Sequence, residues 1–195
     1  IGVTSYVDFL NCISYNEQAT RLAKWGARYP NSVNTYFTAG GRAVAIFTSV
    51  AGTYNTVPAV FDYNIWAKFN PVTHLSWNDL TAYLDWSGLR PMTEFEYEKA
   101  CRGPITPVLN EYAWGTTDYT SINWYWGRDN KLTKNEVLNT FPLGANNVGQ
   151  GMLWRVGIAA TPNSDRVHAG ATYYGILDMT GNAFERAVGG YNFDY

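Results

Sequence analysis

The side chains that could hold a redox metal are few in this sequence. It contains two cysteines, Cys12 and Cys101, and two histidines, His74 and His168. An iron site built from three imidazoles, or from two imidazoles and a carboxylate, needs these rings clustered, whereas the two histidines lie far apart in the sequence. We expect His74 to be a structural, hydrogen-bonded residue before a helix and His168 to lie in a surface loop.

The two cysteines are too few for a disulfide framework. Both fall in expected helices, where a free cysteine commonly behaves as a small buried apolar side chain. Cys12 and Cys101 would pair only if the fold brought them together, and the sequence leaves that alternative open.

Other catalytic patterns are absent or have a plainer explanation. The sequence has no G-x-S-x-G, no P-loop and no H-E-x-x-H. Glu94, Glu96 and Glu98 resemble paired carboxylates, but on a helix Glu94 and Glu98 face one way and Glu96 another. Helix capping and surface charge explain these three residues better than acid–base chemistry does.

The elements that would position these residues begin with helices. Thr4 is a suitable N-cap for a helix over residues 4–12, and residues 17–25 fit a second short helix. Residues 36–61 carry alternating β-branched and aromatic side chains interrupted by glycine, which predicts short strands.

Two further helices carry clear start signals. Ser76 with Asp79 three residues later forms a capping-box pattern, and Gly88 fits the end of that helix. Thr93 with Glu96 repeats the device for a helix that ends at residues 102–103. Beyond Pro107 the pattern becomes irregular, with short strands expected at residues 154–158 and 173–177. The sequence therefore predicts an α+β fold.

Composition limits the class of partner. The chain has 195 residues, the length of one domain, and 14 basic against 16 acidic residues give a net charge of −2. This balance argues against nucleic acid, because phosphate binding needs a basic face. No segment reaches the roughly 18 apolar residues of a membrane span. Aromatic residues make up 16% of the chain. They suit recognition by surface contact, but the plainer alternative is an aromatic-rich core under long loops.

Four segments resemble a known family in order along the chain. Residues 76–90 and 93–103 resemble its two consecutive helix motifs, residues 112–115 its Y-P-W-G element, and residues 174–185 its Y-G-L-Y-D-M-x-G-N-V-W-E-W motif. Residues 6–11 also resemble its first helix. The sequence is thereby identified as a member of the formylglycine-generating enzyme, or sulfatase-modifying factor, family.

The resemblance implies a loop-rich C-type-lectin-like fold whose loops are held by calcium. It implies one single domain over residues 1–195, which we expect to be incomplete at both ends. Family members include copper-dependent oxidases, iron-dependent sulfoxide synthases and non-catalytic binding proteins of bacteria and phages.

Carried over residue by residue, one structural calcium site consists of Asp178 and Glu185 through their side chains and Gly181 and Ala183 through their carbonyl groups. Calcium prefers such oxygen ligands. The alternative is a plain turn braced by Asn182. A second, less complete site would use the Asn123 side chain and the Trp124 carbonyl group.

Copper in this family is held by two cysteines that follow the last motif by several tens of residues. Cys12 and Cys101 match core positions of the family instead, and Cys101 stands where the helix motif has alanine. Copper is expected only if a cysteine pair follows residue 195. The sequence also departs from the family at Pro91-Met92, which replaces Leu-Pro, and at Arg186, which replaces tryptophan.

The sequence favours a non-catalytic, calcium-stabilised surface or secreted module of bacterial or phage origin that recognises a protein or glycan. The expected contact surface is the loop-rich region 110–170 together with Tyr191, Asn192 and Asp194. Two alternatives remain: a copper oxidase of the formylglycine-generating type whose cysteine pair lies beyond residue 195, and a structural subunit of a phage particle or surface filament made of many copies. We expect an extracellular, cell-surface or phage-particle location.

Overall fold

The computed structural model groups the chain into two compact units. Residues 1–90 with 151–154 form the first, and residues 91–150 with 155–195 form the second. Each unit is described by itself, and the expectation of a single domain over residues 1–195 stays a prediction. The structure describes residues 1–21, 36–39, 42–53, 57–63, 67–73, 75–121, 128–129, 134–138, 145–146, 153–183 and 185–189.

The first unit begins with helix α1 (Val3–Cys12), as the apolar spacing predicts. Its N-cap is Gly2 and carries no side-chain cap, so the expected cap by Thr4 is wrong. Tyr6 and Leu10, one turn apart, are fully buried and form the centre of the core. The second helix, α2 (Tyr15–Arg21), starts two residues earlier than expected.

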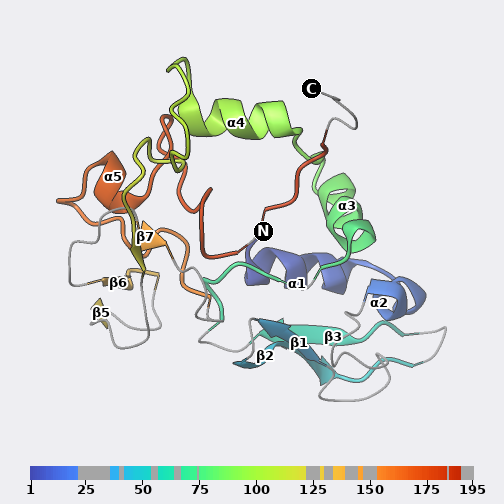
Figure 1. Cartoon of the computed structure of the whole chain (residues 1–195). Helices are drawn as coiled ribbons and strands as arrows, with labels where there is room; N and C mark the ends of the chain where they lie inside the picture. Colours follow the sequence, from blue (N-terminus) through green and yellow to red (C-terminus); the bar gives the residue numbers. More distant parts are fainter. Residues whose placement is uncertain are drawn as a thin grey trace. The chain divides into compact units, whose positions relative to one another are not determined.

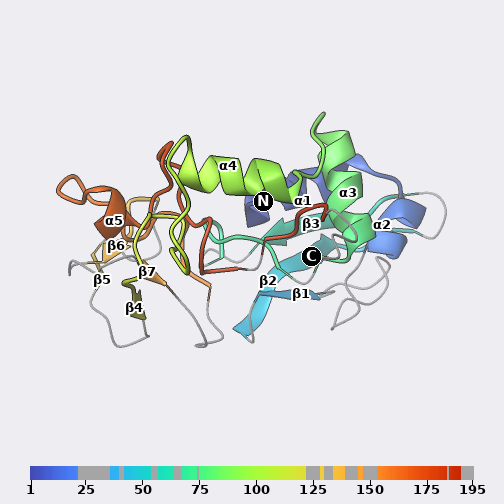
Figure 2. The ribbon, with the colours of Figure 1, turned by 45° about the horizontal axis from the view of Figure 1, so that its top comes forward.

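A three-stranded antiparallel sheet completes this core. It consists of β1 (Tyr36–Ala39), β2 (Arg42–Val50) and β3 (Val60–Tyr63) in the order β1-β2-β3. Ile46 on β2 and Phe61 on β3 are buried in the same cluster as the apolar face of α1. Figure 1 and Figure 2 both show α1 lying along this sheet, in agreement with its contacts to β2 and β3.

Helix α2 is held to the sheet by a buried polar side chain. Gln18 is fully buried, and its amide group donates to the carbonyl oxygens of Leu10 and Ala59. Its own carbonyl oxygen accepts the amide hydrogen of Ala59 at 2.8 Å. The three bonds replace the hydrogen bonds to water that Gln18 loses on burial.

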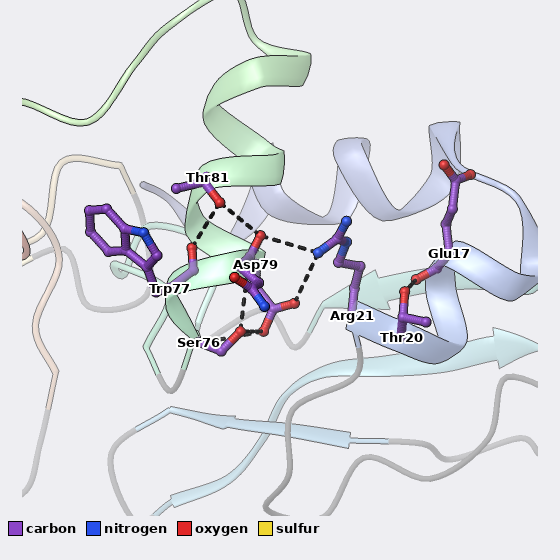
Figure 3. A network of polar contacts seen from close by, with 8 residues as sticks. Glu17, Thr20, Arg21, Ser76, Trp77, Asp79 and Thr81 are labelled. Atoms are coloured by element: carbon purple, nitrogen blue, oxygen red, sulfur yellow. Dashed lines mark hydrogen bonds and ion pairs between the residues drawn. The ribbon is translucent and has the colours of Figure 1, made fainter.

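Helix α3 (Trp77–Trp86) starts at the predicted capping box. The Ser76 hydroxyl accepts the amide hydrogen of Asp79 at 3.2 Å and donates to the Asp79 carboxylate at 2.6 Å. That carboxylate also accepts from the Ser76 amide, and the Arg21 guanidinium of α2 lies 3.9 Å from it. Figure 3 shows Asp79 between Ser76 and Arg21, so the start of α3 is tied to α2.

The second unit contains helix α4 (Glu94–Arg102), whose capping box is also confirmed. The Thr93 hydroxyl accepts the amide hydrogen of Glu96, and the Glu96 carboxylate accepts from the Thr93 amide at 2.8 Å. Gly103 ends the helix with a φ of 64°. Next to the helix start, Thr93 and Val188 form an isolated parallel bridge.

The described remainder of this unit is short strands, turns and one short helix. Strand β4 (Thr120–Ser121) pairs with β7 (Ala145–Asn146), β5 (Arg128–Asp129) pairs with β6 (Val137–Leu138), and α5 spans Arg166–Ala169. His168 lies in α5 rather than in the expected loop, and its ring Nδ1 lies 2.6 Å from the Asp165 carboxylate. His74 falls outside the described residues.

The strands expected at residues 154–158 and 173–177 are wrong. Residues 156–159 form a turn with Gly157 at a φ of 70°, and residues 172–176 form another with Gly175 at 80°. Left-handed glycines of this kind interrupt an extended backbone. The described residues therefore combine helices with few, short strands, which agrees with the α+β expectation.

Both cysteines are free thiols, Cys101 buried and Cys12 exposed. In the described part of the chain, no helix is long and apolar enough to cross a membrane.

The Ser76 cap supports a first prediction. Replacing Ser76 with alanine removes the acceptor for the Asp79 amide and should lower the free energy of unfolding by about 1 kcal/mol. The matched control is Thr81→Ala on the same helix. The exposed Thr81 hydroxyl donates to the Trp77 and Asn78 carbonyl oxygens, and its removal should change the free energy of unfolding by less than about 0.5 kcal/mol. Urea unfolding followed by tryptophan fluorescence measures both. Equal losses for the two variants would contradict the assignment.

Candidate functional site

A turn at residues 178–183 contains three of the four predicted calcium ligands, Asp178, Gly181 and Ala183. Asp178, Gly181 and Asn182 have φ values of 56°, 87° and 59°. Glycine adopts this left-handed region freely, and Asp and Asn tolerate it better than other residues. Three left-handed positions among these five residues bend the backbone sharply within residues 178–183.

The Asp178 side chain is fixed by a second turn. Its carboxylate accepts the amide hydrogen of Gly157 at 2.6 Å. Gly157 sits where a larger residue would not fit, because a Cβ atom there would lie 2.6 Å from the Leu177 side chain. The same turn is tied to β6, since the Leu138 amide donates to the Ile158 carbonyl group at 2.9 Å.

Helix α4 and its following loop brace the turn from the other side. The Tyr97 hydroxyl on α4 donates to the Met179 carbonyl oxygen, and the Ala113 amide donates to the Thr180 hydroxyl at 3.2 Å. Met179, Ala113 and Cys101 are buried in one small apolar cluster against Tyr97. The turn is thus anchored through both its backbone and its apolar side chain.

The two carboxylates of the turn have unusual acidity. Burial raises the pKa of Asp178, while the Gly157 amide and the Arg155 charge act against that rise. Glu185 is exposed as a residue, but protein atoms around its carboxyl group reduce the contact of that group with water and raise its pKa to about 7, and the Asp178 charge adds to the rise. The turn therefore carries an acidic pair whose full ionisation is unfavourable at neutral pH.

The nearby thiol is not activated. Cys101 is 5% exposed, and burial raises its pKa. A nucleophilic cysteine reacts as the thiolate, and a raised pKa disfavours that form. Cys101 therefore acts as a packing residue in the apolar cluster, as its place in an alanine position of the helix motif predicted.

Of the four residues of the first predicted site, Asp178, Gly181 and Ala183 lie in the turn at residues 178–183, and Glu185 follows it in the chain; the calcium site itself stays a prediction. Asn123 and Trp124, the second predicted calcium site, lie outside the described residues, as do the predicted contact residues Tyr191, Asn192 and Asp194. Among the described residues no three His, Cys, Asp or Glu side chains gather in a metal-binding group. A cation at the turn would therefore need backbone carbonyl ligands as well.

Sequence reasoning missed the residues that support the turn. Gly157 and Arg155 come from a segment that the sequence predicted as a strand, and the Tyr97 hydroxyl comes from a helix read only for its capping box. No local pattern marks these residues, because each acts on the turn through contacts 21 to 82 residues apart in the sequence.

Comparison with known proteins gives consistent matches. Residues 63–192, which include the turn, match the family described as Sulfatase-modifying factor enzyme 1-like domain. The formylglycine-generating enzyme of Mus musculus is 31% identical over 118 residues, which are 57% of this chain and 31% of that enzyme. The inactive C-alpha-formylglycine-generating enzyme 2 of Bos taurus is 31% identical over 115 residues, 59% of this chain and 31% of that protein.

A hercynine oxygenase of Mycobacterium tuberculosis is 35% identical over 80 residues, 40% of this chain and 18% of that enzyme. The matched stretch thus spans less than a third of each of these relatives. No solved structure matches the chain significantly.

The Gly157 turn supports a second prediction. Replacing Gly157 with alanine imposes a left-handed backbone on an L-residue, which costs about 1–2 kcal/mol, and also drives the new methyl group against Leu177. Gly175→Ala is the matched control, because Gly175 has a φ of 80° but no atom within 4 Å of the added Cβ. Urea unfolding should show the larger loss for Gly157→Ala. A loss no greater than that of Gly175→Ala would mean that the Leu177 contact relaxes freely.

The raised pKa of Glu185 supports a third prediction. In the presence of a chelator, the folded state keeps a proton on Glu185 between its ordinary pKa of 4.5 and about 7, where the unfolded chain has lost it. Stability therefore falls as pH rises through this window. Glu185→Gln should remove that part of the decline. The stability of the variant relative to the native chain should therefore increase from pH 4 to pH 7.5. Thermal unfolding across this range measures it, and parallel curves for the two proteins would refute the pKa assignment.

Proposed function

The chain belongs to the sulfatase-modifying factor enzyme 1-like domain family, and from this premise we propose that it is a non-catalytic, calcium-stabilised binding or structural module. We place it at a bacterial cell surface, in a secreted protein or in a phage particle. Its partner in this proposal is a protein or a glycan. Fold-level kinship alone does not assign a function, so the argument rests on the turn at residues 178–185.

The fold we infer for the chain is the C-type-lectin-like variant expected for the family. Its support is the combination of short strands, capped helices and long connecting turns in the described residues. In such a fold, loops provide recognition surfaces while the turns beneath them need fixing. This assigns the turn a structural role beneath a binding surface.

The observation that carries the proposal is the acidic pair on the turn. In this proposal the Asp178 and Glu185 carboxylates and the Gly181 and Ala183 carbonyl groups would supply the oxygen donors that Ca²⁺ prefers. A divalent cation would neutralise two carboxylates whose joint ionisation is otherwise resisted, as the pKa of Glu185 at about 7 indicates. When bound, calcium supplies charge and crosslinking to the turn and no reaction chemistry.

The buried Cys101 thiol supports the non-catalytic half of the proposal. Cys101, next to the turn, is buried with a raised pKa, and the exposed Cys12 belongs to the other compact unit. The family also contains proteins named as inactive, and one of them matches more than half of this chain. The aromatic residue Tyr191, together with Asn192 and Asp194, provides the proposed contact residues.

A second function is favoured by the matches to enzymes. The formylglycine-generating enzyme of Streptomyces coelicolor is 52% identical over 46 residues, 24% of this chain and 14% of that enzyme. Copper-dependent oxidation of a cysteine peptide is therefore the alternative activity. It requires a thiolate pair that the sequence of 195 residues does not provide in the matching motif.

Calcium titration tests the proposed calcium site. Isothermal calorimetry on chelator-treated protein should detect Ca²⁺ binding, and Asp178→Asn and Glu185→Gln should each weaken it at least about tenfold, since each removes a charged ligand. The matched control is Asp118→Asn, an exposed carboxylate of the same unit, which should bind as the native chain does. Calcium binding that ignores Asp178 and Glu185, or no binding, would reject this site.

Two further measurements on the full chain test for copper-dependent thiol oxidation and for glycan recognition. Incubation with Cu(I), oxygen and a cysteine-containing peptide should consume peptide thiol no faster than the same mixture without the protein. Binding to a glycan array should depend on calcium and fall in the Asp178→Asn variant. Thiol loss that requires the protein and exceeds the copper-only rate would establish the alternative enzyme instead.

A further inference from the structure

The Arg155 guanidinium donates only to backbone carbonyl groups in the hydrogen bonds described below, two of them in the turn at residues 156–159. Its Nε donates to the Glu136 carbonyl oxygen at 2.5 Å, its Nη1 to that of Val156 at 2.7 Å and its Nη2 to that of Gly157 at 2.9 Å. Three backbone acceptors fix the guanidinium in place. Its charge is therefore held at one position rather than swinging on a long side chain in solvent.

Gly157 connects this fixed charge to Asp178. Its carbonyl oxygen accepts from Arg155, and its amide donates to the Asp178 carboxylate at 2.6 Å. The guanidinium and the carboxylate thus bind the two polar groups of one residue. The backbone of Gly157 holds the opposite charges near each other without a direct bond between them.

The electrostatics agree with this placement. Burial lowers the pKa of Arg155, and the negative charges of Glu136 and Asp178 oppose that change. In return, the Arg155 charge favours the ionised form of Asp178. Glu136, which is 6% exposed, is the other acidic group that faces this guanidinium. Asp178 is partly buried, and a guanidinium held nearby compensates for the water that its carboxylate has lost.

We propose that Arg155 is the built-in counter-cation of Asp178, which holds the turn at residues 178–185 in the absence of calcium and weakens its binding of the ion. The claim that Arg155 weakens calcium binding rests on the proposed function, whereas the claim that Arg155 is the counter-cation of Asp178 does not. Both claims follow from the positive charge of Arg155. A fixed positive charge stabilises the ionised Asp178 when no metal is bound, and it repels an added divalent cation at the same carboxylate.

The experiment compares three substitutions in the full chain. Arg155→Met removes the charge and the hydrogen bonds, Arg155→Gln removes the charge but keeps a donor, and Arg155→Lys keeps the charge. In EDTA, the neutral variants should melt at a lower temperature than the native chain, and this loss should shrink in an Asp178→Asn background. In calcium titrations, the neutral variants should bind Ca²⁺ about tenfold more tightly, the scale of one nearby charge. Arg155→Lys should stay near the native affinity.

A structural control separates charge from anchoring. The Arg166 guanidinium of the same unit donates to the carbonyl groups of Ala113 and Ala171, so Arg166→Met also removes backbone hydrogen bonds. It should lower the melting temperature by an amount that does not depend on Asp178, and it should leave calcium affinity unchanged.

The outcomes distinguish the two claims. Neutral variants that bind calcium no more tightly than the native chain overturn the weakening effect. A loss of stability that is equally large in the native background and in the Asp178→Asn background overturns the counter-cation role. If neither the native chain nor any variant binds calcium, the calcium claims of both proposals fall, and the EDTA comparison still decides the counter-cation role. Arg155→Gln provides that comparison if Arg155→Met does not fold.

Discussion

The hydrogen bond from the Gly157 amide to the Asp178 carboxylate joins two turns that are 21 residues apart, and the geometry of the acidic site follows from it. It fixes the direction of the Asp178 side chain, and it brings the guanidinium of Arg155 to the same residue through the Gly157 carbonyl group. Gly157 can occupy this position because it has no Cβ to meet Leu177. Packing, charge and backbone conformation therefore depend on one small residue.

Local signals in the sequence predicted the helices well. The Ser76–Asp79 and Thr93–Glu96 capping boxes lie within one helical turn, so their chemistry is readable from four residues. The strands expected near Gly157 and Gly175 were wrong, because their β-branched and aromatic neighbours favour extension whereas the left-handed glycines form turns. Composition alone does not reveal the sign of φ.

The candidate site also has a part that local sequence predicts and a part that only the folded chain reveals. Its proposed ligands were named from one eight-residue motif that resembles the family, and they stay a prediction. Its supports could not be named in this way, since Gly157 and Tyr97 reach the turn through contacts with Asp178 and Met179 that are distant in the sequence. The family match covers residues 63–192 and so shows the family of the chain. Next to the turn, the buried Cys101 with its raised pKa is a packing residue.

Gln18 has a consequence for how the first unit opens. Helix α2 has seven residues, too few to be stable in water by itself, and its fully buried Gln18 satisfies both the amide and the carbonyl group of Ala59. The Ala59 amide is therefore protected from hydrogen exchange by a helix side chain rather than by a neighbouring strand. When α2 detaches, that amide and the Leu10 carbonyl group lose their partners together, so the short helix and the segment before β3 form a single cooperative opening unit.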